Sequence, residues 1–213
     1  MRNLLPLFLD LAGRDVLLVG GGPVASAKLR QLLAARARVR IVSPLVLAEI
    51  DRLGRSERVD IMRRAFEPSD LDGVWLAVAA ATPDVNRAVA AAAEARRIFV
   101  NAVDDPENAS AYLSGVVRRD DVTIAISTGG DAPGLTSLVR EALQAVLPRD
   151  LHEWVQTARE QRAGWRRDHM PMTARKPLLL QALNDLYPTP VERERKATTS
   201  RVPWLSGPED SWL

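Results

Sequence analysis

The chain carries the sequence VLLVGGGPVA at residues 16–25, and this stretch decides the fold. Four apolar residues lead directly into three glycines, and a helical pattern follows at once. A continuous apolar run of this length is typical of a strand buried on both faces of a parallel sheet. The stretch therefore predicts a buried strand, a tight turn and the start of a helix.

The glycines have the spacing of a dinucleotide-binding turn. Gly20, Gly22 and Ala25 match the pattern Gly-x-Gly-x-x-Gly/Ala. Gly20 permits the tight turn, Gly22 lets backbone N–H groups approach a pyrophosphate, and Ala25 lets the helix pack close to the strand. Pro23 suits the first helical position, and the helix N-terminus offers donors and partial positive charge to phosphates. A glycine-rich turn without a ligand is the alternative.

Strands and helices alternate up to residue 105. Strands are expected at residues 16–19, 39–43, 59–62, 74–79 and 98–103. Helices are expected at residues 23–35, 45–53 and 83–96. This alternation implies parallel βαβ units with right-handed crossovers, so residues 1–105 are predicted to form a Rossmann-type parallel sheet of the α/β class. Residues 4–9 are expected to add a short strand or an edge segment.

The pattern changes after residue 105. Residues 111–117 and 122–127 are strand-like and separated by four charged residues, which indicates a β-hairpin. Helices are expected at residues 134–147, 151–165 and 178–186. We therefore divide the chain into a Rossmann domain (1–105), a hairpin and helix region (106–150), a helical region (151–188) and a tail (189–213). The tail is polar and is predicted to be mobile, although it carries Trp204 and Trp212.

The composition excludes several classes of function. The 213 residues contain no cysteine, which rules out disulfides, thiolate catalysis and Cys-ligated metal clusters. The net charge of +2 gives no reason to expect a nucleic-acid partner. No apolar run approaches the roughly 20 residues that cross a bilayer, and the N-terminus lacks a signal-peptide cleavage site. We expect a cytoplasmic protein without a membrane partner.

Polar residues gather where the predicted strands end. Residues 20–24, 43–45 and 101–105 all follow strands, and an open α/β sheet binds its ligands at the carboxyl ends of its strands. The acidic residue that usually holds the ribose about 20 residues past the glycines is missing. Ser43 or backbone groups would have to replace it, so the choice between NAD and NADP stays open.

Asp104 is the candidate catalytic residue, as a general base or a metal-facing carboxylate. A turn-forming role is the alternative, because Asp near Pro106 commonly starts a turn, and Asp105 competes for the same function. His152 and His169 are not spaced as a metal pair and are expected at the surface or in helix packing. Four arginines on one predicted helix form either a solvated face or a clamp for a polycarboxylate: Arg159, Arg162, Arg166 and Arg167.

Five ordered segments resemble one known family. They are residues 5–8 (LPLF), 19–28 (VGGGPVASAK), 98–104 (IFVNAVD), 125–133 (AISTGGDAP) and 138–141 (LVRE). Over about residues 4–165 the chain resembles precorrin-2 dehydrogenase, the N-terminal module of siroheme synthase, here expected in a stand-alone form. Because several motifs match in order, this likeness is more specific than the glycine pattern alone.

The resemblance implies NAD-dependent oxidation of precorrin-2, a tetrapyrrole, to sirohydrochlorin. Ferrous iron enters only as a substrate, which some members of the family insert to form siroheme. Asp104 matches the aspartate that removes a proton, and it is implicated in metal handling where iron is inserted. The hairpin and the helices after it match the part that forms a homodimer.

The same resemblance assigns binding residues. The expected cofactor residues are Gly20, Gly22, Pro23, Val24, Ser43, Pro44, Leu45, Asn101 and Val103. The expected substrate residues are Thr128, Gly129 and Gly130. Two rival functions are kept: a non-enzymatic dinucleotide-sensing module, and a dehydrogenase of another acidic small molecule.

Overall fold

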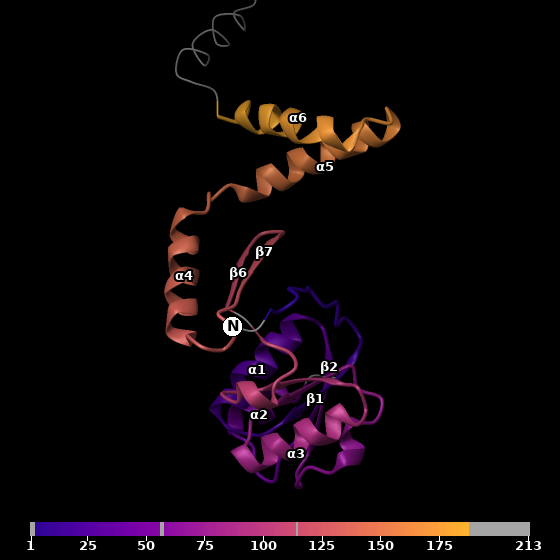
Figure 1. Ribbon diagram of the computed structural model, residues 1–213, viewed down its shortest axis with the longest axis vertical. Helices are drawn as coiled ribbons and strands as arrows, with labels where there is room; N and C mark the ends of the chain where they lie inside the picture. Colours follow the sequence, from indigo (N-terminus) through magenta and orange to yellow (C-terminus); the bar gives the residue numbers. More distant parts are fainter. Residues whose placement is uncertain (1–2, 56–57, 114, 188–213) are drawn as a thin grey trace, which may run out of the picture. The chain divides into compact units, whose positions relative to one another are not determined.

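A computed structural model describes residues 3–55, 58–113 and 115–187 of the chain. Five strands form one parallel sheet in the order β3-β2-β1-β4-β5 (Figure 1). The strands are β1 (Asp15–Val19), β2 (Arg38–Val42), β3 (Val59–Met62), β4 (Leu76–Ala79) and β5 (Phe99–Ala102). The predicted α/β class with a parallel sheet is confirmed.

The glycine turn leaves the sheet at its centre. β1 pairs with β2 on one side and with β4 on the other, and Val19 lies opposite both Val42 and Ala79. The strand order reverses at β1, because the chain steps outward to β2 and β3 and then returns to β4 on the other side. Such a switch point opens a crevice at the carboxyl ends of the strands, which is where residues 20–24 lie.

Alternate residues of the central strand bury opposite faces of the sheet. Val16 and Leu18 pack with α1 (Pro23–Ala34) and α2 (Ala48–Leu53), whereas Leu17 and Val19 pack with α3 (Pro83–Glu94). Figure 1 shows α1 and α3 on either side of the strands. Burying each such aliphatic side chain contributes about 1.5–3 kcal/mol relative to exposure. The continuous apolar run at residues 16–19 is therefore explained by a sheet that is covered on both faces.

The short strand, one of the two expectations for residues 4–9, is wrong. The chain from residue 3 to residue 11 has no strand or helix, and Leu5 and Phe8 are 80% and 73% exposed. Pro6 cannot donate to a sheet ladder, and the pairings of the five-stranded sheet do not include this stretch. Apolar composition alone is therefore a misleading signal, because a strand also requires a neighbour with which to pair.

The predicted hairpin exists but is shifted along the chain. β6 (Gly115–Arg119) and β7 (Val122–Ile126) form a separate two-stranded sheet. The first strand thus begins later than the expected residue 111, and it includes two of the four charged residues that the pattern assigns to the turn. Only Asp120 and Asp121 connect the strands, and Asp120 has a φ of +52°, a left-handed conformation that aspartate accepts readily.

Three longer helices follow the hairpin: α4 (Pro133–Val146), α5 (Leu151–Arg167) and α6 (Met172–Asn184). α6 begins six residues before the expected start at residue 178, with Pro177 inside it. A proline usually marks a helix boundary, which is why the sequence predicts a later start. Short 3₁₀ helices lie at Pro68–Leu71 and Pro106–Asn108.

Two compact units divide the described residues. One comprises the chain up to Val116 together with Ala125–Gln144, and the other comprises Val117–Ile124 together with the chain from Ala145 on. In the second unit, α5 and α6 run side by side, and the Trp154 indole N–H donates to the Tyr187 hydroxyl at 2.7 Å. No helix within the described ranges is long and apolar enough to cross a membrane. The predicted tail, with Trp204 and Trp212, lies outside the described residues.

An ion pair between a buried carboxylate and a partly exposed arginine stabilises the segment after β3. Asp70 is 3% exposed and accepts hydrogen bonds from the Arg64 guanidinium at 2.5 and 2.8 Å. It also accepts the backbone N–H of Glu67 at 2.8 Å. The hydrogen bonds from Arg64 hold the pKa of the Asp70 carboxyl below its ordinary value. The charged carboxylate is therefore favoured in the folded state.

We predict that Asp70→Asn destabilises the protein by about 2 kcal/mol at pH 7, because the amide loses charge-assisted hydrogen bonds from Arg64. The lowered pKa stabilises the fold above the ordinary carboxyl pKa, and this contribution is lost as pH falls through the folded value. Denaturant unfolding at about pH 7 and about pH 3 should show the variant's deficit shrinking at low pH. A deficit of equal size at both values would contradict this electrostatic origin.

Candidate functional site

The turn after β1 requires glycine at its first position. Gly20 has a φ of +123°, and a Cβ placed there would lie 2.2 Å from the backbone oxygen of Ala80. The Gly20 N–H also donates to the carbonyl of Val42 at 3.0 Å. The strand β1 thus turns sharply between the ends of β4 and β2, as the glycine spacing predicted.

The second glycine is equally constrained, and the sequence pattern does not reveal it. A Cβ on Gly21 would lie 1.9 Å from the Leu45 carbonyl oxygen. The N–H of Leu47 donates to the Gly21 carbonyl at 2.9 Å, so the turn and the loop after β2 are hydrogen-bonded together. No local signal marks this contact, because the two segments lie far apart in the sequence.

The third glycine faces open space. A Cβ on Gly22 would meet no atom within 4 Å among the described residues, its two neighbours in the chain aside. Gly22 is the N-cap of α1, no side chain caps it, and Pro23 follows at the first helical position. The first-turn N–H groups of α1 are therefore free of a side-chain acceptor, and the helix dipole favours an anion there. These features fit the pyrophosphate of a dinucleotide.

The loop after β2 is ordered by Ser43. Its hydroxyl donates to the Leu45 carbonyl at 2.7 Å, and the residue is 9% exposed. That proton is consequently engaged within the loop rather than turned toward a ribose. Leu45 is 84% exposed and Val24 is 43% exposed, which leaves apolar surface on both segments that flank the turn.

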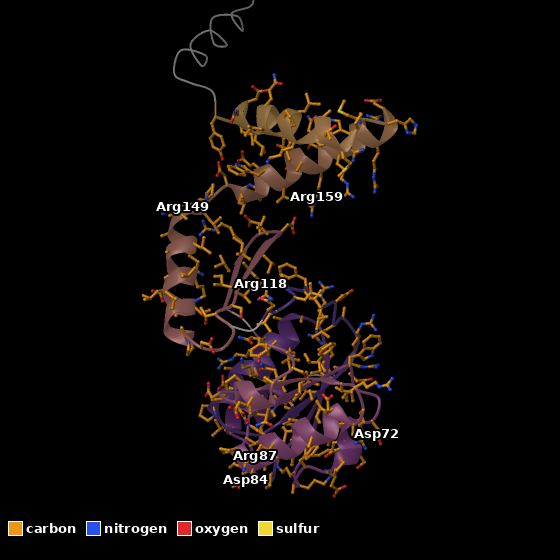
Figure 2. The ribbon with its side chains drawn as sticks, in the orientation of Figure 1. Asp72, Asp84, Arg87, Arg118, Arg149 and Arg159 are labelled. Atoms are coloured by element: carbon orange, nitrogen blue, oxygen red, sulfur yellow. The ribbon has the colours of Figure 1, made fainter. Side chains whose placement is uncertain are left out.

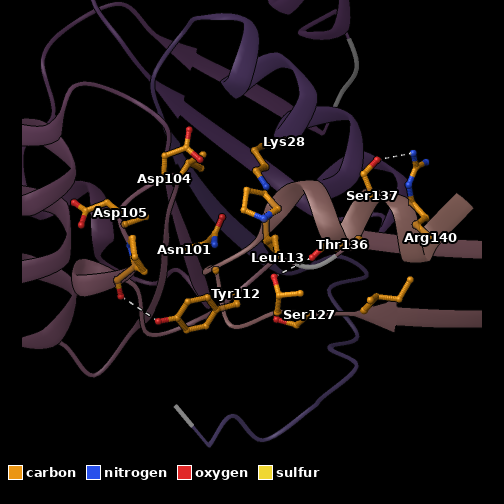
Figure 3. Close-up of a pocket in the computed structure, with 18 residues that line it drawn as sticks. Lys28, Asn101, Asp104, Asp105, Tyr112, Leu113, Ser127, Thr136, Ser137 and Arg140 are labelled. Atoms are coloured by element: carbon orange, nitrogen blue, oxygen red, sulfur yellow. Dashed lines mark hydrogen bonds between the residues drawn. The ribbon is translucent and has the colours of Figure 1, made fainter. Parts of the chain in front are cut away.

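A cavity of about 340 Å³ lies in the first unit, beyond the end of β5 (Figure 3). Its volume is within the range of small-molecule sites. The walls come from α1, the stretch after β5, the base of the hairpin and the first turns of α4. Among its lining residues are Lys28, Asn101, Val103, Asp104, Asp105, Thr128, Gly130, Thr136 and Arg140.

Asp104 and Asp105 differ in what their carboxylates do. The Asp105 carboxylate accepts two hydrogen bonds from the Asn108 side-chain amide, at 2.8 and 2.9 Å. Asp104 is exposed, and its carboxylate makes no hydrogen bond or ion pair among the described residues. Its backbone is left-handed, with a φ of +55°. Asp105 therefore has the turn-forming role, and Asp104 is free to meet a ligand in the cavity.

Asn101 sits at the end of β5 and lines the same cavity. Its side-chain N–H donates to the Ala111 carbonyl at 2.9 Å, which fixes the amide. Its Oδ1 is buried and has no partner within the described part of the chain. An unsatisfied buried acceptor favours a donor from a ligand or from water. Val103 lines the cavity and donates its N–H to the Ala79 carbonyl at 2.9 Å.

The second glycine turn, at Gly129 and Gly130, leads into α4. Both residues have a positive φ, of 70° and 93°. Thr128 and Gly130 line the cavity, and Gly129 does not. The Thr128 hydroxyl accepts the Ala132 N–H at 3.2 Å and lies 3.0 Å from the Thr136 hydroxyl. Thr128 thus anchors the start of α4 as well as facing the cavity.

Lys28 and Arg140 are the two cationic residues of the cavity wall, and neither is predicted as a site residue from the sequence. Lys28 lies on α1 and is half-buried. Burial lowers the pKa of its ammonium group, and attraction to Asp104 opposes that effect. The helical position of Lys28 is readable from the sequence, but its approach to residue 104 is not.

The four arginines that the sequence offers as a solvated face or as a clamp lie on α5. Arg159, Arg162, Arg166 and Arg167 all belong to the second unit. Arg159 pairs there with Asp121 at 2.9 Å and projects from α5 (Figure 2). His152 is exposed and lies 3.8 Å from the Asp120 carboxylate. His169 follows α5 with a φ of +52°.

These features define a dinucleotide-binding α/β protein: a parallel sheet, a switch point at β1, and a glycine turn that opens onto a helix N-terminus. Comparison with known proteins agrees. The chain belongs to the family described as putative NAD(P)-binding, which matches residues 7–115. The expected nicotinamide dinucleotide is confirmed at the level of this family.

Several relatives extend the likeness beyond that region. The siroheme synthase of Citrobacter koseri is 40% identical over 173 residues, covering 81% of this chain and 38% of that protein. Siroheme synthase 1 of Aeromonas salmonicida is 45% identical over 148 residues, covering 69% of this chain and 32% of that protein. The chain therefore spans well under half the length of these relatives.

A solved structure is similar over nearly its whole length. The structure of SirC, a precorrin-2 dehydrogenase, covers 86% of this chain and 92% of its own, with a TM-score of 0.66 and 26% sequence identity. The expected sequence family and fold are thereby confirmed.

Gly21 and Gly22 should respond differently to an added methyl group. We predict that Gly21→Ala strongly lowers the unfolding temperature, since its Cβ would overlap the Leu45 carbonyl. Gly22→Ala should leave the unfolding temperature within about 2 °C of the native value, because the added methyl group faces open space. The same variant should weaken NAD binding at least about tenfold, because the methyl group would crowd the pyrophosphate. Thermal unfolding and calorimetric titration with NAD test both. Equal NAD affinity of Gly22→Ala and the native chain would refute the assigned phosphate position.

Proposed function

We propose that this protein catalyses the NAD-dependent dehydrogenation of precorrin-2 to sirohydrochlorin in the cytoplasm, the first step from precorrin-2 toward siroheme. The observation that carries the proposal is the unengaged Asp104 carboxylate inside a cavity of a NAD(P)-binding fold. The likeness to SirC, which spans 92% of that protein, supports the choice of substrate.

Different segments of the chain are proposed to bind different parts of the dinucleotide. The first turn of α1 and Gly22 would hold the pyrophosphate, and backbone groups of residues 43–45 would hold the ribose. Val24 and Leu45 offer exposed apolar surface to the adenosine part of the cofactor. When bound, NAD supplies the acceptor for the hydride that leaves the macrocycle.

Asp104 takes up the proton that the reaction releases. The carboxylate would accept the proton that precorrin-2 gives up besides the hydride, so the overall products would be sirohydrochlorin, the reduced dinucleotide and one proton. An exposed carboxylate with no competing hydrogen bond is available for this transfer. Asn101, fixed by Ala111, and Thr128, fixed at the start of α4, form the walls against which the tetrapyrrole is oriented.

A second copy of the chain is the proposed protein partner. Along α4, Leu135, Leu138 and Val139 follow a helical spacing and are 53%, 65% and 37% exposed. No residue of α4 is buried, although the helix has a clear apolar side. An exposed apolar stripe of this kind favours a protein interface, and a closed homodimer is the commonest way to cover it.

The direct test of the reaction is anaerobic NADH formation from enzymatically made precorrin-2. We expect turnover by the native chain and a loss of at least about 100-fold in kcat for Asp104→Asn, as follows from removing a general base. Asparagine is the suitable replacement, because it tolerates the positive φ at this position and has nearly the same shape. NAD affinity should stay at the native value.

Asp105→Asn is the matched control, since it also lines the cavity but its carboxylate is bonded to Asn108. It should keep kcat within about threefold of the native value. NAD binding without any turnover by the native chain would favour a sensing module instead. Intact NAD binding without tetrapyrrole binding would favour another dehydrogenase. Ferrous iron added to the completed reaction tests insertion separately, through the absorption of siroheme.

The dimer is tested by sedimentation equilibrium. We expect Leu138→Glu to shift the native dimer to monomer, because a charge would be buried in the apolar stripe. Leu7→Glu is the control, since Leu7 has a similar exposure of 63% but lies outside the stripe. A native chain that sediments as a monomer would refute the proposed dimer. Dissociation of both variants to monomers would refute α4 as the specific dimer contact.

A further inference from the structure

Lys28 is a cationic residue of the cavity wall that has no role in the reaction proposed above. It projects from α1 into the cavity that Asp104 lines, and Figure 3 shows the two side chains on the same side of that cavity. It makes no hydrogen bond or ion pair among the described residues, and attraction to Asp104 acts on it from beyond ion-pair distance. A half-buried ammonium group without a close partner costs free energy, which a bound anion would offset.

The other charged residues of the cavity wall are engaged elsewhere. Arg140 lies within hydrogen-bond distance of the Ser137 hydroxyl and pairs with Glu141 at 3.5 Å. Asp105 is bonded to Asn108. Among the charged side chains of the cavity wall, only the Lys28 ammonium group and the Asp104 carboxylate therefore make no hydrogen bond or ion pair within the described residues.

The position of Lys28 separates it from the dinucleotide turn. It lies five residues past Pro23 in α1, about 7.5 Å farther along the helix axis. None of residues 20–24 lines the cavity, whereas Lys28 does. The ammonium group consequently faces the ligand that meets Asp104 rather than the phosphates at the helix N-terminus.

We propose that Lys28 binds a carboxylate of the tetrapyrrole and thereby contributes to its affinity for the cavity that Asp104 also lines. The inference rests on the proposed function, because it needs a substrate that carries acetate and propionate groups. Lysine suits this task, since its long flexible stem can follow a carboxylate while its charge stays in the cavity.

Steady-state kinetics with precorrin-2 test the inference. Lys28→Met removes the charge and keeps most of the volume, so we expect the KM for precorrin-2 to rise about 10- to 100-fold, the usual loss for a charge-assisted hydrogen bond. The KM for NAD and kcat should stay within about threefold of their native values. Lys28→Arg should restore part of the affinity, because it returns the charge.

Arg30→Met is the matched control on the same helix. Arg30 is exposed and pairs with Glu49 at 3.1 Å, outside the cavity. Its KM for precorrin-2 should be native. Circular dichroism of each variant shows whether the fold is kept, and Lys28→Gln replaces Lys28→Met if the latter does not fold.

Direct binding separates this inference from the reaction itself. Uroporphyrin, a tetrapyrrole that carries a carboxylate on every side chain, serves as the probe, and quenching of tryptophan fluorescence reports its binding. We expect Lys28→Met to weaken binding about tenfold or more at low salt, with the difference shrinking as salt screens the charge.

The outcomes distinguish the two proposals. No turnover by the native chain would refute the dehydrogenase, whatever Lys28 does. Native turnover with an unchanged KM in Lys28→Met would refute the carboxylate contact alone. A raised KM for NAD would place Lys28 on the dinucleotide, and a loss confined to kcat would place it in the chemical step; both overturn the inference.

Discussion

The backbone of Gly20 and Gly21 approaches two neighbouring loops more closely than any side chain would permit. A Cβ atom added to these residues would fall 2.2 Å from the Ala80 carbonyl oxygen and 1.9 Å from the Leu45 carbonyl oxygen. The turn therefore locks the end of β1 between the segments that follow β4 and β2. Both binding regions depend on this turn, because it fixes the direction in which α1 starts. That direction determines where the N-terminus of α1 and Lys28 lie.

The same constraint explains why the fold is readable from the sequence. A strand buried on both faces requires a continuous apolar run, and a turn without room for side chains requires glycines. Both requirements therefore appear as short sequence patterns. The parallel sheet follows from the alternation of strands and helices. The failure at residues 4–9 has the opposite origin. Those residues have strand-like composition, but pairing depends on a neighbour that the local sequence does not specify.

The site is only partly readable, for a related reason. Asp104 is identifiable because it comes just after a buried strand, but nothing local distinguishes it from Asp105. The distinction rests on the amide of Asn108, which engages one carboxylate and leaves the other unbonded. Lys28 belongs to a segment that resembles the family, yet its own role is not apparent there, because its meeting with Asp104 depends on helix α1 packing against the sheet.

The cavity holds opposite charges without letting them neutralise each other. Had Lys28 and Asp104 formed a close ion pair, the carboxylate would be a weaker base and the ammonium group a weaker anion receptor. Their attraction acts instead across a gap that the structure leaves to a ligand, and burial of Lys28 sharpens its preference for a compensating anion. A substrate that brings a carboxylate to one group and a removable proton to the other satisfies both. A polycarboxylate macrocycle has this combination, which is why we propose a tetrapyrrole rather than a small neutral alcohol as the substrate.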